Sequence, residues 1–247
     1  MTGVGRFAWT ELKLNLRDPL MVFWSMAFPC LWLLIMAVII GVPIPGFAYE
    51  GLNFASFVFP AGVSLVLLNS SFIGVPQTLT TYRERGVLKR LRATPVKIST
   101  IALGFSLSQL GFVVLGIVLL FVVGKVFLGV RILGSPAVLI AVCFAGMTTF
   151  MAIGCAIGSV AKSFRSASII IWTAFIPMIM LSELFLPISI LPTWLQPLAR
   201  MLPLTAVNTL LRDIVFGVPL DDLWRLAVLS GWLLVSVLLT VRLFRWE

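Results

Sequence analysis

The sequence contains no histidine in its 247 residues, and only 11% of its residues are charged. The lack of histidine excludes His-based catalytic triads, His-ligated metal sites and histidine proton relays. Its three cysteines, Cys30, Cys143 and Cys155, stand singly in apolar runs, with neither metal-ligand spacing nor a paired framework. We therefore predict that they are small core residues.

A nucleotide-binding motif is also missing. A P-loop needs G-x-x-x-x-G-K-[ST], so that backbone amides cradle phosphate and a hydroxyl reaches magnesium. The one Gly-Lys pair is Gly124-Lys125, with Leu119 in place of the first glycine and Val126 in place of the hydroxyl residue. We predict that the chain is no enzyme by itself, binds no cofactor and takes its energy from a partner or an ion gradient.

Apolar residues are abundant and make up 60% of the sequence. A membrane-spanning helix needs about 20 of them, because each residue adds about 1.5 Å across about 30 Å of hydrocarbon. Six apolar stretches with at most one charged residue each reach this length: residues 20–40, 57–79, 101–123, 137–160, 169–186 and 223–241. We predict an all-α polytopic membrane protein, with a single transmembrane domain over residues 1–247 and no fused soluble domain. The first stretch is too long for a signal peptide and is expected to be retained.

The net charge of +9 is distributed unevenly. With the amino terminus inside, 13 of the 18 Lys and Arg fall in inner segments, whereas the nine acids divide into four inside and five outside. The five outer cations are Lys125, Arg131, Arg200, Arg212 and Arg225. This bias predicts a multi-pass protein with both termini in the cytoplasm, and it explains the basic composition without nucleic acid.

Two segments outside the spans are predicted to lie at membrane interfaces. Residues 1–19 place Trp9, Leu12 and Leu16 on one helical face and cations on another, which indicates an interfacial amphipathic helix ended by Asp18-Pro19. In one interpretation, this helix is a lipid-surface anchor and has no further role. Residues 187–222 are apolar but broken by prolines, which is typical of short helices in, or dipping into, the outer interface.

The most charged segment is 81–97, TYRERGVLKRLRATPVK, with six cations and one acid in 17 residues. An apolar stripe of Val87, Leu88 and Leu91 accompanies these cations, with Gly86 before it and Pro95 after it. The segment could be a basic loop that binds anionic lipid head groups. The compact stripe favours the other interpretation, a short helix that fits the groove of a partner.

Residues 84–95, ERGVLKRLRATP, resemble the cytoplasmic loop between the second and third spans of type-2 ABC exporter permeases, a family that includes daunorubicin-resistance-type drug exporters and polysaccharide exporters. The resemblance extends over nearly the whole chain, through Arg17-Asp18-Pro19, the six spans and an outer run that contains Trp194, Pro203-Leu204-Thr205 and Arg212. One departure is Glu183, since the family often has Gly directly after the serine at position 182.

The resemblance implies a permease subunit of a bacterial inner-membrane ABC exporter that moves an amphipathic drug, lipid or glycan-linked substrate outward, as in multidrug efflux. It further implies a second permease copy or paralogue and two separate ATPase subunits, which bind ATP and Mg. The amphipathic amino-terminal helix and a coupling helix would both contact the ATPase. The coupling helix would consist of Arg83, Glu84, Arg85, Gly86, Val87, Leu88, Lys89, Arg90, Leu91, Arg92, Thr94 and Pro95.

Polar residues inside the spans allow two interpretations. Interhelical hydrogen bonding is the default, and the alternative is a substrate path that includes Ser64, Asn69, Phe72 and Glu183. Glu183 could equally pair with Arg200 or Arg212. The G-x-x-x-G of Gly154 and Gly158 indicates close helix packing, within one subunit or between two.

Two other classes of transporter compete with the exporter. A secondary transporter or channel would need ion-coupling acids at mid-depth, and none of the six stretches has a charge there. An energising subunit of an ABC importer would be expected to have two long basic coupling helices, and one is evident here.

Overall fold

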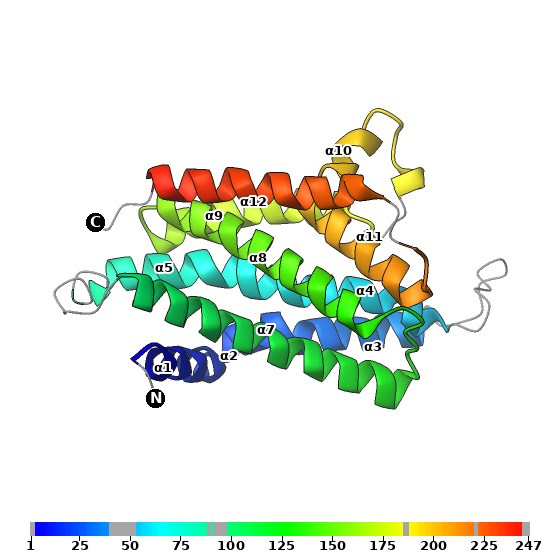
Figure 1. Ribbon diagram of the computed structural model, residues 1–247, viewed down its shortest axis with the longest axis horizontal. Helices are drawn as coiled ribbons and strands as arrows, with labels where there is room; N and C mark the ends of the chain where they lie inside the picture. Colours follow the sequence, from blue (N-terminus) through cyan, green and yellow to red (C-terminus); the bar gives the residue numbers. More distant parts are fainter. Residues whose placement is uncertain are drawn as a thin grey trace.

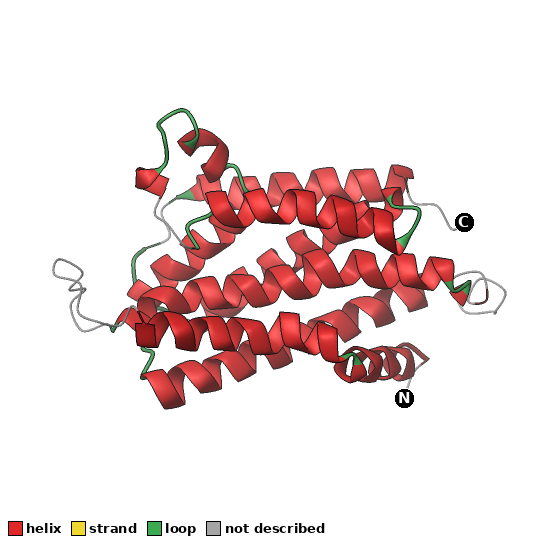
Figure 2. Cartoon of the chain, turned by 180° about the vertical axis from the view of Figure 1, so that it is seen from behind, coloured by secondary structure: helices red, strands yellow, loops and turns green. Residues whose placement is uncertain are grey.

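The structure is a computed structural model that describes residues 3–39, 53–87, 90, 98–184, 188–219 and 222–243. Within these ranges all the regular secondary structure is helical, with turns and loops between the helices, and six helices are long and apolar enough to cross a membrane (Figure 1, Figure 2). These candidate spans are Pro19–Val38, Phe54–Glu84, Leu103–Leu128, Pro136–Val160, Phe164–Leu181 and Leu223–Leu243. The predicted all-α polytopic fold with six transmembrane helices is confirmed.

The helices follow one another along the chain in an antiparallel bundle (Figure 1). Their bounds are α1 Gly3–Arg17, α2 Pro19–Val22, η1 Phe23–Ala27, α3 Phe28–Ile39, α4 Phe54–Leu67, η2 Leu68–Ile73, α5 Gly74–Glu84, α7 Ile98–Leu128, α8 Pro136–Val160, α9 Phe164–Leu181, η3 Ile188–Ile190, α10 Gln196–Arg200, α11 Pro203–Phe216 and α12 Leu223–Leu243. η1 and η2 are π-helical, and they connect α2 to α3 and α4 to α5 without a break.

Three spans differ from the predicted stretches by more than two residues at an end. The second runs to Glu84 and the third to Leu128, because a helix continues through charged residues near its ends where apolar counting stops. The fifth begins at Phe164 and ends at Leu181, not at 169 and 186. Ser163 and Ser166 form a capping box at its start, and Ser182 is already extended at its end.

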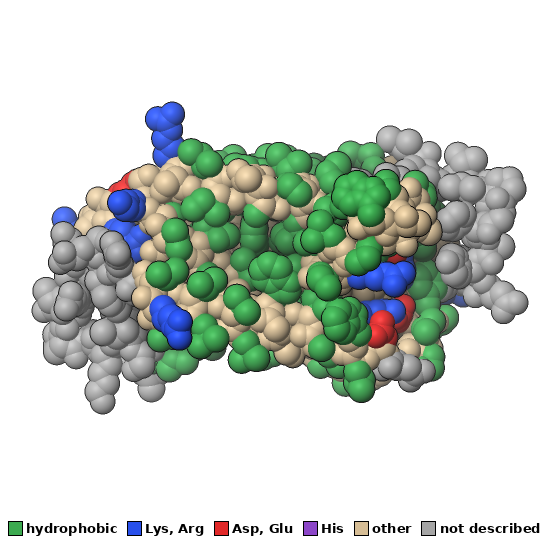
Figure 3. All heavy atoms as spheres, turned by 90° about the horizontal axis from the view of Figure 1, so that it is seen from above, with side chains coloured by type: hydrophobic (Ala, Val, Ile, Leu, Met, Phe, Trp, Pro, Cys, Tyr) green, Lys and Arg blue, Asp and Glu red, His purple; other side chains and the backbone are tan. Residues whose placement is uncertain are grey.

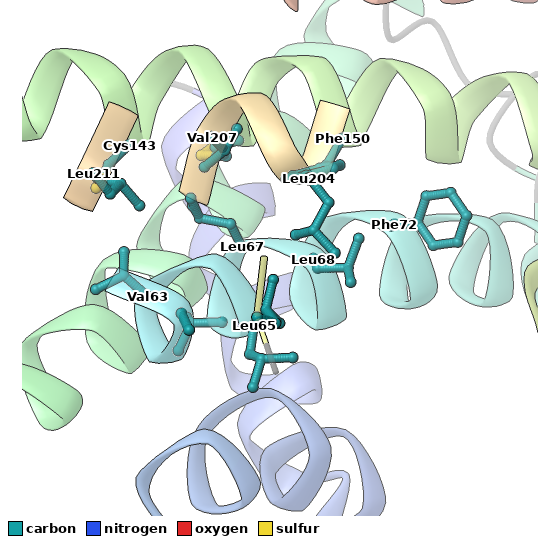
Figure 4. Close-up of a cluster of buried hydrophobic side chains, with 14 of the residues drawn as sticks. Val63, Leu65, Leu67, Leu68, Phe72, Cys143, Phe150, Leu204, Val207 and Leu211 are labelled. Atoms are coloured by element: carbon teal, nitrogen blue, oxygen red, sulfur yellow. The ribbon is translucent and has the colours of Figure 1, made fainter. Parts of the chain in front are cut away.

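The second span is the centre of the bundle. In its most apolar window 94% of the residues are buried, against 11% to 50% in the other five spans. Its side chains meet α8 and α11 in one core, where Leu67 and Leu68 lie near Val207, Leu204 and Phe150 (Figure 4). The predicted outer segment therefore includes an inserted helix, since almost all of α11 is buried, whereas the short α10 lies outside the bundle.

Close packing in this core depends on glycine. A Cβ on Gly154 of α8 would lie 2.6 Å from the carbonyl oxygen of Ser71, and one on Gly158 would lie 3.0 Å from the side chain of Leu79. The G-x-x-x-G therefore packs α8 against η2 and α5 within the subunit, which confirms the first of its two interpretations.

The amino-terminal helix α1 packs across the start of α7. Phe7 covers Gly104, where an added Cβ would lie 2.5 Å from its ring, and Leu12 covers Gly111. Trp9 and Leu16 are exposed on the other side, 54% and 41%, so they remain available to lipid. The helix thus has one face for the bundle and another for its surroundings.

Candidate functional site

Both chain termini lie at one end of the bundle, together with the exit of α5 and the turn between α8 and α9 (Figure 1). We call this the terminal end, and the opposite end, which holds Glu183 and the last turn of α11, the far end. Charged side chains gather near the two ends, while the face between them is mostly apolar (Figure 3). The predicted coupling segment begins at the terminal end.

The last turn of α5 reaches α1 through Tyr82. Its hydroxyl donates a hydrogen bond of 2.6 Å to Oε2 of Glu11, which is only 5% exposed. Burial raises the pKa of the Glu11 carboxyl above its ordinary value, and the hydrogen bond from Tyr82 offsets part of that rise. Sequence reasoning missed Glu11; the signal was an acid on the face of Phe7 and Asn15, away from the exposed Trp9.

The next residue, Arg83, reaches the end of α8. Its Nη1 donates to the carbonyl oxygens of Gly158, at 3.0 Å, and of Ala161, at 2.5 Å. The last carbonyls of a helix lack partners within the helix and carry partial negative charge. A guanidinium at this place supplies both the donors and the complementary charge.

Glu84 reaches the start of α9. Its Oε1 accepts a hydrogen bond of 2.8 Å from the backbone N–H of Phe164, the first residue of that helix. The first N–H groups of a helix have no internal acceptors, and negative charge is favourable beside them. The adjacent residues Arg83 and Glu84 therefore cap the two helix ends on either side of the α8–α9 turn.

The chain changes direction immediately after these contacts. Gly86 has a φ of +67°, a left-handed backbone conformation that residues with a side chain rarely adopt. The N–H of Arg90 donates a hydrogen bond of 3.1 Å to the carbonyl oxygen of Gly86. Arg85 and Arg90 are exposed. The predicted coupling residues Leu88, Lys89, Leu91, Arg92, Thr94 and Pro95 lie outside the described residues.

The predicted substrate-path residues of the second span are buried in the subunit. Ser64, Asn69 and Phe72 are at most 2% exposed. Asn69 lies in η2 and donates a hydrogen bond of 2.7 Å to the carbonyl oxygen of Trp24 in η1. Gln109 of α7 donates to the carbonyl oxygen of Ser70. These amides satisfy carbonyls in the two π-helical segments, which are frequent at functional sites.

Glu183 pairs with Arg212 at the far end. Oε2 of Glu183 lies 2.6 Å from Nη2 of Arg212, and the two side chains are 13% and 27% exposed. The amide of Asn208 donates to the Glu183 carbonyl oxygen at 3.0 Å, and the Ser64 hydroxyl donates to Asn208 at 3.5 Å. A polar chain therefore connects Ser64 with Glu183 through α11. Of the two candidate cations, Arg212 is the one that pairs.

The other far-end charges hold α11 to the start of α12. Arg225 forms ion pairs with Asp213 and, at 3.1 Å, with Asp222. Backbone bonds from Leu133 and Gly134 to Val215 and Ile214 tie the α7–α8 loop to the same helix. The inserted helix is thus fixed from two sides.

In a comparison with protein families, the model described as ABC-2 type transporter matches residues 3–216, from α1 to the end of α11. A comparison with curated proteins gives no match. Membership of this family implies a partnering ABC ATPase subunit. The matched residues include five of the six candidate spans, and the last, Leu223–Leu243, follows the match. The chain is a multi-pass membrane permease and belongs to the ABC-2 type transporter family.

Proposed function

We propose that the chain is the permease of a bacterial ABC exporter, in which two permease copies, or one and a paralogue, work with two ATPase subunits that bind ATP and Mg. The terminal end lies in the cytoplasm of a cell whose inner membrane holds the complex. An amphipathic drug, lipid or glycan-linked substrate leaves toward the far end.

One observation carries the proposal: the basic segment 81–97 leaves the second span, which is the most buried, directly beside contacts to three other helices. Movement of this segment by a bound partner would therefore be transmitted to the second span, at the centre of the bundle. Cations and an apolar stripe give the segment the chemistry to bind a partner's groove. Rigid-body rearrangement of packed helices is a common response to such binding.

The proposed substrate path runs beside the second span and includes Ser64, Asn69, Phe72 and Glu183. All four are buried or paired in the present arrangement, so transport requires the second span to shift against α11. The π-helical segment η2 favours such a shift. Its hydrogen bonds to other helices involve the side-chain amides of Asn69 and Gln109, and these bonds can exchange without unfolding the span. Parting of Glu183 from Arg212 would open the far end.

The proposal is tested with the permease purified from its host membrane and reconstituted in lipid vesicles. An ABC ATPase should copurify, and ATP added on the terminal-end side should drive a cationic amphipathic dye toward the far-end side. Movement in the opposite direction would identify an importer. Movement driven by an ion gradient, with no bound ATPase, would identify a secondary transporter and contradict the proposal.

A further inference from the structure

Three consecutive residues at the end of α5 each bind a different helix. Successive helical residues point about 100° apart, so Tyr82, Arg83 and Glu84 leave the helix in three directions. Tyr82 binds Glu11 of α1, Arg83 binds the last turn of α8, and Glu84 binds the first residue of α9. Their partners are 71 to 80 positions away in the sequence.

We infer that Tyr82, Arg83 and Glu84 form a joint that makes α1 and the α8–α9 turn move together with the basic segment 81–97. The inference rests on the proposed function, because the partner ATPase supplies the motion. These side chains thus have a positioning role within the permease, and α1 and the α8–α9 turn receive the motion.

The two caps make the α8–α9 connection follow α5. Arg83 and Glu84 bind backbone groups, which cannot swing away as side chains can. Only residues 161–163 separate the capped ends, and Ala161 is 2% exposed. Because a cation faces the helix carboxyl end and an anion faces the helix amino end, displacing α5 alone would break both favourable pairings.

The Tyr82 contact makes α1 follow as well. The Glu11 carboxylate is buried between α1 and the bundle, and a buried charge without its hydrogen bond is costly. Gly86 follows the joint at a φ of +67°, so the chain redirects only after all three contacts are made. The exposed Arg85 and Arg90 then lie beyond the joint, on the part available to a partner.

The alternative is that these contacts only stabilise the fold. A stabilising role predicts a lower melting temperature with normal coupling, whereas a joint predicts lost coupling in complexes that assemble normally. The variants Arg83→Ala and Glu84→Ala remove one cap each. Glu84→Gln keeps an oxygen that accepts from Phe164, and Tyr82→Phe removes only the hydroxyl that binds Glu11.

The experiment uses the permease–ATPase complex in lipid nanodiscs, with Cys30, Cys143 and Cys155 replaced by alanine. Spin labels are attached at Lys162→Cys in the α8–α9 turn and Trp194→Cys at the far end, both exposed sites. Labelled permease is diluted with unlabelled permease, and the distance is measured with and without a non-hydrolysable ATP analogue. A second pair replaces the Lys162 label with one at Lys13 on α1.

We expect ATP-analogue binding to change both distances in the wild type. Glu84→Ala and Arg83→Ala should abolish the change at position 162 and lower permease-dependent ATPase stimulation about tenfold, a typical strength for coupling between sites. Tyr82→Phe should abolish the change at position 13 only. Glu84→Gln should restore the wild-type change, and Arg165→Ala, which removes a nearby exposed cation, should leave both distances unaffected.

Three results overturn the inference. They are an unchanged distance in the wild type, a wild-type change in the Ala variants, and a melting temperature so lowered in Glu84→Gln that it matches Glu84→Ala. In each case copurification of the ATPase with the wild-type permease still supports the proposed function. Loss of that copurification would instead contradict the proposed function itself.

Discussion

Glu183, which pairs with Arg212 at 2.6 Å, is the most buried carboxylate in the ion pairs of the described residues, at 13% exposed against 18% for Asp213. Glu183→Gln keeps the shape of the side chain and leaves Arg212 without its counter-charge. We expect a loss of about 1 to 2 kcal/mol of stability, between the values for an exposed pair and for a buried bond between charges. Thermal unfolding in detergent measures it.

The exposed pair of Asp222 and Arg225 provides the matched control. Asp222 is 51% exposed, so Asp222→Asn should change stability by less than about 0.5 kcal/mol. Unchanged stability of Glu183→Gln, combined with selective loss of export of a cationic dye, would assign Glu183 to the substrate and not to Arg212.

We expect Glu11 to make the docking of α1 depend on pH. Its pKa in the folded chain is raised above the ordinary value of 4.5, so the folded state binds the proton more tightly than the unfolded state. Stability from docking is therefore full below pH 4.5 and is lost as pH rises through the raised pKa. Glu11→Gln should remove this dependence while keeping an acceptor for Tyr82.

The melting temperature measured across mildly acidic to neutral pH tests this expectation. Tyr82→Phe deletes the hydrogen bond that lowers the Glu11 pKa, so it should move the transition to higher pH. A wild-type profile identical to that of Glu11→Gln would show that the carboxyl does not titrate with docking.

At the scale of elements, the contact of α8 with the second span is the tightest test of packing. A methyl on Gly154 would press against the Ser71 backbone, which cannot turn aside. Gly154→Ala should lower stability by about 1 to 3 kcal/mol, the usual range for an overpacked core. Thermal unfolding of the purified permease would measure the loss.

Gly231→Ala is the control, because nothing lies within 4 Å of a Cβ at that position of α12. Alanine in an exposed helix should be neutral or stabilising by about 0.5 to 1 kcal/mol. Equal effects of the two substitutions would contradict the packing described here.

The sequence predicts the spans well, because their length and lack of charge are properties of each segment alone. It predicts their ends less well, since the start of α9 depends on the pairing of Ser163 with Ser166 and its end on the extended Ser182. The burial of α11 could not be predicted from Pro-rich apolar residues, which suit a surface and an inserted helix equally. Long-range partners such as Glu11 and Tyr82 require the packing itself.

For the candidate site, the sequence predicts segment 81–97 as a contact to a partner, which stays a prediction, and it does not predict the contacts of that segment within the chain. Arg83 and Glu84 are predicted as contacts to a partner, and the structure adds helix caps inside the chain. Charge identifies a residue's chemistry, whereas its partner 80 positions away depends on the fold. Arg212 was one of two candidates for Glu183, and only the position of α11 distinguishes it from Arg200.

At the scale of the whole molecule, the distribution of cations predicts that the terminal end is cytoplasmic. Reporter fusions after Gly129 and after Val218, both at the far end, should report the outer side. A fusion after Lys162, in the α8–α9 turn, should report the cytoplasm. The opposite pattern would reverse the orientation and place segment 81–97 out of reach of any cytoplasmic ATPase.

The proposed function requires that a separate ATPase drives this permease through segment 81–97. The most direct measurement compares ATPase binding and permease-stimulated ATP hydrolysis for the wild type and for a variant with Ser at Val87, Leu88 and Leu91. We expect the variant to insert normally, because its cations remain, but to lose binding or stimulation, because the apolar stripe is gone. Unchanged binding, hydrolysis and transport would contradict the proposed function and leave the segment as a basic loop on lipid head groups.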